Sequence, residues 1–198
     1  MFEKAAEGKV NYIGGASSIL TEMRMVKTAD ELAKMAEAQR ITDAAFSHIL
    51  EYIRPDMTEI DVALELEFFM RKNGAERTSF DTIAVSGTAS SMPHGVPRNV
   101  KLEKGFLTMD FGCVYEGYCS DMTRTVCIGK ADEEIKRVYY TVLKAQKDAL
   151  AAAAAGERGC FRLDEIARDV INGAGYEGRF GHSLGHGVGM FIHESPRL

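Results

Sequence analysis

The sequence has no tryptophan, only four prolines and four cysteines, and no excess of positive charge. A net charge of −5 leaves no basic surface for a nucleic acid or an anionic lipid, so neither partner is expected. No run of about 18 apolar residues is present to span a membrane, and no apolar signal segment follows Met1. The cysteines lack CxxC spacing, which favours reduced thiols. These absences indicate a soluble protein of the cytoplasm.

Capping residues and apolar residues near a 3.6-residue period predict four helices, from Thr28 to Pro55, from Thr58 to Gly74, from about Asp132 to Ala155 and from about Leu163 to Gly173. Segments rich in β-forming residues predict three strands, Thr82–Ser86, Phe106–Val114 and Tyr118–Ile128. Two helices therefore precede the first strand, and residues 1–25 show no sustained period. Because helices and antiparallel strands are grouped rather than alternating, the fold class is α+β.

Two aspartates flank the predicted hairpin. Glu116-Gly117 suits a two-residue turn, in which glycine accepts a positive φ. With that turn, Asp110 pairs opposite Thr123, and Asp121 is its diagonal neighbour on the same face. Side chains reaching inward from there can hold two metal ions ~3.5 to 4 Å apart. The alternative is a strand-end cap and a solvated strand residue, but the apolar run around Asp110 makes an unpaired charge there costly.

Three of the five histidines, His182, His186 and His193, lie in one short glycine-rich stretch. That density predicts a metal site or an acid/base site. The interspersed glycines disfavour a helix and favour a strand that lets a ligand approach the backbone. In a regular strand His186 and His193 would point to opposite faces, so a bulge or separate turns must intervene.

A fourth histidine, His94, lies in a loop between Pro93 and Pro97. Because prolines fix φ, the loop is stiff and His94 is held in place. Such a histidine can donate a hydrogen bond to a substrate carbonyl or a developing oxyanion. The alternative is a surface turn whose histidine has no function. His48, within the first helix, is expected to be structural.

Together these motifs resemble the M24 pita-bread metallopeptidase family, in its aminopeptidase P and prolidase (Xaa-Pro peptidase) branch. The stretch from His182 to Glu194 resembles the family's signature. Asp110 and Asp121 resemble its first two metal ligands, and His94 resembles its substrate-contacting histidine. The resemblance implies the pita-bread (creatinase/aminopeptidase) fold for residues 26–198.

The resemblance also implies a role for each residue. Asp110 would chelate one of two divalent metal ions, Asp121 would bridge both, and His186 would bind the other. Manganese suits this oxygen-rich set, with cobalt, iron or zinc as alternatives. A bridging water would attack the peptide carbonyl. His94 and His193 would be catalytic and substrate-binding residues at the scissile bond, while His182 would shape the pocket for proline.

Implied substrates are peptides with proline at the second position, and the sequence does not choose between aminopeptidase and dipeptidase. Residues 26–198 would form an incomplete catalytic domain, its C-terminal part missing, and residues 1–25 a remnant of an N-terminal domain and linker. Family members carry two more glutamate ligands further on, so impaired metal binding and activity are expected, and a homodimer could cover exposed faces. A non-catalytic peptide- or protein-binding pita-bread domain and a methionine aminopeptidase are the alternatives.

Overall fold

The computed structural model describes residues 15–198. Residues 1–14, part of the segment interpreted as a domain remnant, lie outside the described residues. Three helices precede the first strand, namely α2 (Ala16–Met25), α3 (Ala29–Tyr52) and α4 (Glu59–Lys72). The prediction of two missed α2, which has Ile19, Leu20 and Met23 at helical spacing but has no capping side chain and buries none of its residues.

The strands form two small antiparallel sheets and one short pair. One sheet has the order β2-β3-β6, from Ile83–Ser86, Gly105–Phe111 and Met122–Ile128, and another has the order β1-β4-β5, from Arg77–Thr78, Cys113–Tyr115 and Tyr118–Cys119. Strand β1 and the 3-10 helix η1 (Gly87–Ser91) were not predicted. The predicted turn is confirmed, with φ of 44° at Glu116 and 80° at Gly117.

Both predicted long strands are interrupted. Gly112 separates β3 from β4, and a Cβ atom there would lie 2.1 Å from the carbonyl oxygen of Ser120. The second strand is interrupted at Ser120 and Asp121, so Asp121 lies between β5 and β6 rather than within a strand. The predicted register holds before and after these interruptions, since Asp110 pairs with Thr123 and Val114 pairs with Cys119. The interruptions at Gly112 and at Ser120 and Asp121 thus place the tip of the hairpin, formed by β4 and β5, in a second sheet.

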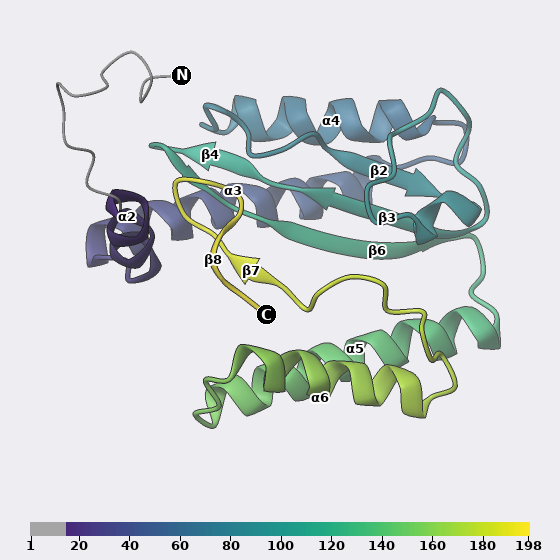
Figure 1. Ribbon diagram of the computed structural model, residues 1–198. Helices are drawn as coiled ribbons and strands as arrows, with labels where there is room; N and C mark the ends of the chain where they lie inside the picture. Colours follow the sequence, from purple (N-terminus) through teal and green to yellow (C-terminus); the bar gives the residue numbers. More distant parts are fainter. Residues whose placement is uncertain (1–14) are drawn as a thin grey trace, which may run out of the picture.

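The main core lies between the sheets and helices α3 and α4 (Figure 1). From β3 it receives Leu107, Met109 and Phe111, which are fully buried. Because side chains alternate along a strand, Thr108 and Asp110 point to the opposite face. Asp110 is therefore directed away from the core.

Helices α5 (Glu133–Ala154) and α6 (Cys160–Gly173) form a hairpin with a small core of its own. Helix α6 begins three residues before the predicted start at Leu163. The chain then returns, yellow in Figure 1, between this hairpin and the sheet β2-β3-β6. It ends in β7 (His186–Gly187) and β8 (Glu194–Arg197), an antiparallel pair. In the described part of the chain, no helix is both long and apolar enough to cross a membrane.

Candidate active site

One cleft of about 790 Å³ is lined by all six predicted site residues, His94, Asp110, Asp121, His182, His186 and His193. They come from four places in the fold, which are the loop after η1, strand β3, the β5–β6 junction and the segment around β7. The cleft lies on the sheet face opposite α3 and α4, to which the alternation along β3 directs Asp110. Tertiary folding therefore brings together residues that the sequence separates.

Asp110 is held by its partner across the ladder. The hydroxyl of Thr123 donates a 2.8 Å hydrogen bond to Asp110 Oδ1. Burial raises the pKa of the Asp110 carboxyl, while this hydrogen bond and the imidazoles of His94 and His186 lower it. The effect of burial is the larger, so the pKa of Asp110 is raised overall. Burial therefore disfavours the ionised carboxylate, and a cation bound nearby would stabilise it.

Asp121 lies against the imidazole of His186, with 3.4 Å between Asp121 Oδ2 and His186 Nε2. Burial raises the pKa of Asp121, the carboxyl of Asp110 raises it further, and His186 lowers it. Two carboxylates therefore repel each other in one cleft. A divalent cation relieves repulsion of this kind.

The imidazole of His186 is oriented by the backbone. Its Nδ1 lies 3.0 Å from the carbonyl oxygen of Gly187, and because a carbonyl only accepts, Nδ1 is the donor. In the neutral ring, Nε2 then presents a lone pair toward the Asp121 carboxylate. Two facing acceptors suit a shared cation, as in a metal site. The residues present fit a divalent ion in their donor chemistry.

His186 and His193 face the same cleft, with ring centroids 4.4 Å apart and planes at 61°. The ladder is irregular between His186 and Gly187, and Gly189 N donates to Phe191 O at 3.1 Å in a separate turn. The predicted need for a bulge or turns is confirmed. Burial lowers the pKa of His193, and the neighbouring cationic groups lower it further.

On the other side of the cleft, the rings of His94 and His182 lie 6.1 Å apart and nearly perpendicular. Within residues 15–198, no group of three or more His, Cys, Asp or Glu side chains is arranged to hold a metal ion. Asp121 and His186 are thus in contact, whereas Asp110 shares the cleft without completing a coordination shell. Thr108 was not among the predicted site residues, although its alternation with Asp110 along β3 places it in the same cleft.

This α+β architecture, with two carboxylates and an imidazole in one cleft, is that of the pita-bread metallopeptidases. The chain belongs to metallopeptidase family M24, whose family model matches residues 33–198. The match includes every residue of the cleft named above.

Relatives with solved structures or curated sequences support the assignment. An uncharacterized peptidase of Bacillus subtilis, YqhT, is 47% identical over 178 residues, which are 89% of this chain and 50% of that protein. The Xaa-Pro dipeptidase of Pyrococcus furiosus is 42% identical over 181 residues, which are 91% of this chain and 52% of that protein. The structure of an X-Pro aminopeptidase from Thermotoga maritima superposes with a TM-score of 0.89 at 42% identity, over 99% of this chain and 56% of that one. The chain spans about half the length of the curated relatives it matches.

Proposed function

We propose that this chain carries part of the active site of a dinuclear metallopeptidase that cleaves Xaa-Pro bonds. One observation carries the metal site: Asp121 Oδ2 and His186 Nε2 meet at 3.4 Å in a cleft that Asp110 also lines. The substrate class is supported by relatives named Xaa-Pro dipeptidase and X-Pro aminopeptidase. In this proposal Asp110, Asp121 and His186 hold two divalent ions, with manganese as the first choice.

The bound ions would supply Lewis acidity toward the peptide carbonyl and a water of lowered pKa. The remaining histidines would act on the substrate. His193 stays neutral at pH 7 because its pKa is lowered, and a neutral imidazole can donate one N–H to the substrate carbonyl. His94, held on its loop, would donate from the other side, and His182 beside it would line the pocket for proline.

We further propose that residues 1–198 alone bind manganese weakly and have impaired activity. The resemblance implies two further glutamate ligands, and the described residues offer no group of three that is arranged for an ion. A homodimer and a cytoplasmic location also stay predictions.

The test is peptide hydrolysis by the complete gene product with Mn²⁺, using an Xaa-Pro dipeptide, an Xaa-Pro-Yaa tripeptide and a methionyl peptide without proline. Cleavage of either proline peptide, lost in Asp121→Asn, is the expected result. Preference for the methionyl peptide would favour a methionine aminopeptidase. Binding of the proline peptides without turnover would favour a non-catalytic domain.

A further inference from the structure

A buried carboxylate outside the cleft contacts both ends of the loop that carries His94. Glu59 is the first residue of α4 and is 0% exposed, which is unusual for a charged side chain. Burial by itself raises the pKa of Glu59, but hydrogen bonds from Arg98 and Ser86 lower it to about 2. Glu59 is therefore ionised inside the protein and is not among the residues that line the cleft.

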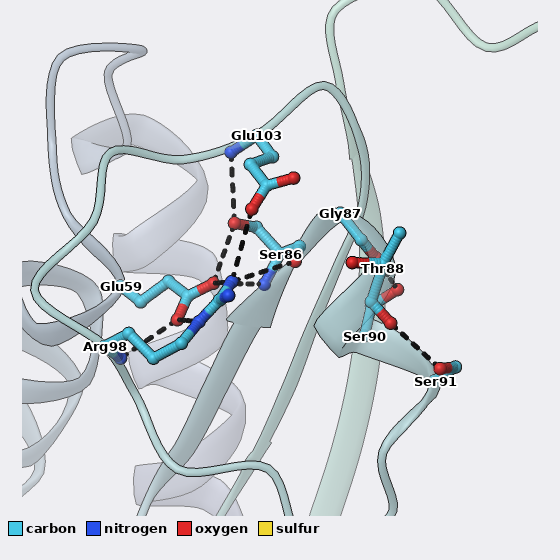
Figure 2. A network of polar contacts seen from close by, with 8 residues as sticks. All are labelled: Glu59, Ser86, Gly87, Thr88, Ser90, Ser91, Arg98 and Glu103. Atoms are coloured by element: carbon cyan, nitrogen blue, oxygen red, sulfur yellow. Dashed lines mark hydrogen bonds and ion pairs between the residues drawn. The ribbon is translucent and has the colours of Figure 1, made fainter.

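The partners of Glu59 lie immediately before and after the loop 87–97 (Figure 2). On the N-terminal side, Ser86 donates to Glu59 Oε1 from its backbone N at 2.7 Å and from its hydroxyl at 2.9 Å. On the C-terminal side, Arg98 donates to Oε2 from its backbone N and from Nε, both at 2.9 Å. Arg98 Nη2 adds a contact of 2.6 Å to Oε1. One carboxylate thus closes the base of the loop.

Inside the loop, short-range contacts make a stiff unit. The hydroxyl of Ser90 donates to the carbonyl oxygen of Gly87 at 2.6 Å, and Gly95 N donates to Met92 O at 3.2 Å. Gly95 is buried against β2, where a Cβ atom would lie 3.0 Å from Val85 Cγ1. With its interior fixed in this way, the loop takes its position from its two ends and from the contact of Gly95 with β2.

We propose that Glu59 is a positioning residue that fixes His94 against the substrate by holding Ser86 and Arg98 together. The inference rests on the proposed function, in which His94 contacts the peptide. Without the carboxylate, the donors of Ser86 and Arg98 lose their common acceptor, and the direct contact that remains between the loop ends is the 3.4 Å one from Arg98 Nη2 to the carbonyl oxygen of Ser86. A displacement of about 1 Å at a catalytic group can reduce a rate by about 100-fold.

The test compares the complete gene product, loaded with Mn²⁺, as wild type, Glu59→Gln and Arg98→Lys. The second variant keeps a positive charge beside Glu59 and loses only the forked contact, so it remains informative if Glu59→Gln does not fold. Glu103→Gln is the matched control, because Glu103 contacts Arg98 Nη2 at 3.3 Å from the exposed side. We expect kcat/KM for an Xaa-Pro peptide to fall roughly 10- to 100-fold in the two test variants. Mn²⁺ affinity and the activity of Glu103→Gln should be unchanged.

Nuclear Overhauser effects between ¹³C-labelled histidine rings, measured with diamagnetic Zn²⁺ in place of the paramagnetic Mn²⁺, separate positioning from general stability. The His94–His182 contact should weaken in both test variants, while the His186–His193 contact, 4.4 Å between centroids, persists. Weakening of both contacts together would make Glu59 merely structural and overturn the proposal. Unchanged kcat/KM in a folded variant would also overturn it. If wild-type protein cleaves no Xaa-Pro peptide, the proposed function fails, yet the ring contacts still report whether Glu59 places His94.

Discussion

Lys27 Nζ lies 3.0 Å from Glu194 Oε2, in an ion pair between residues 167 positions apart. The side chains of Lys27 and Glu194 are only 11% and 6% exposed. The other oxygen of Glu194 accepts a 3.0 Å hydrogen bond from Phe191 N. Arg24 adds its guanidinium over the ring of Phe191, 4.4 Å from the centroid. The α2–α3 junction therefore holds the turn that precedes β8 and presents His193.

Lys27→Met should lower the free energy of unfolding by about 3–5 kcal/mol, because it leaves the Glu194 carboxylate buried and unpaired. Urea denaturation monitored by circular dichroism measures the change. Lys34→Met is the control, since Lys34 pairs with Asp30, whose side chain is 78% exposed. That substitution should cost less than about 1 kcal/mol. Equal effects of the two substitutions would show that the buried pair contributes no more to the free energy of unfolding than the exposed one.

Gly112→Ala should destabilise the fold by about 3 kcal/mol, because the new Cβ atom would meet the backbone carbonyl oxygen of Ser120 at 2.1 Å. A backbone atom cannot rotate away as a side chain can. Gly181→Ala is the matched control, with nothing within 4 Å of its Cβ position. Thermal unfolding of the two variants compares them, and a Gly112→Ala protein as stable as Gly181→Ala would contradict the close crossing of the chain.

Glu59 should contribute a pH-dependent part of the stability. Its pKa is lowered from 4.5 to about 2 in the folded protein, so the contribution is present above pH 4.5 and is lost as the pH falls toward 2. A shift of this size corresponds to about 3 kcal/mol. Urea titrations at pH 7 and pH 3 should show the stability difference between wild type and Glu59→Gln shrinking at the lower pH. A constant difference would argue against an ionised Glu59.

His186→Ala should weaken Mn²⁺ binding to the complete gene product by at least about 100-fold, since it removes the imidazole that faces Asp121. Isothermal titration calorimetry measures the affinity. His193→Ala is the control, because its ring lies 4.4 Å from that of His186 yet is assigned to the substrate. It should retain the metal and lose peptide hydrolysis. Loss of metal in both variants would assign His193 to the metal as well.

The sequence by itself determined the features that depend on residues close together in the chain, namely helix starts, a turn and a signature stretch. Capping boxes at Thr28 and Thr58 start helices where they were predicted, since the cap and its acceptor are only three residues apart. Glu116-Gly117 fixed the turn and thereby the pairing of Asp110 with Thr123. The stretch from His182 to Glu194 resembles the family's signature, and this resemblance identified the family that the sequence comparisons support.

Tertiary structure alone decided what depends on distant partners. Helix α2 has no capping side chain and no buried residue, and its place depends on contact with the turn before β8. The break at Gly112 follows from the approach of Ser120 in the crossing chain. Glu59 and its partner Arg98 are 39 positions apart, and Lys27 is 167 positions from its partner Glu194. Local spacing carries no information on such pairs, because only the packed fold creates the low-exposure environment that makes each partner necessary.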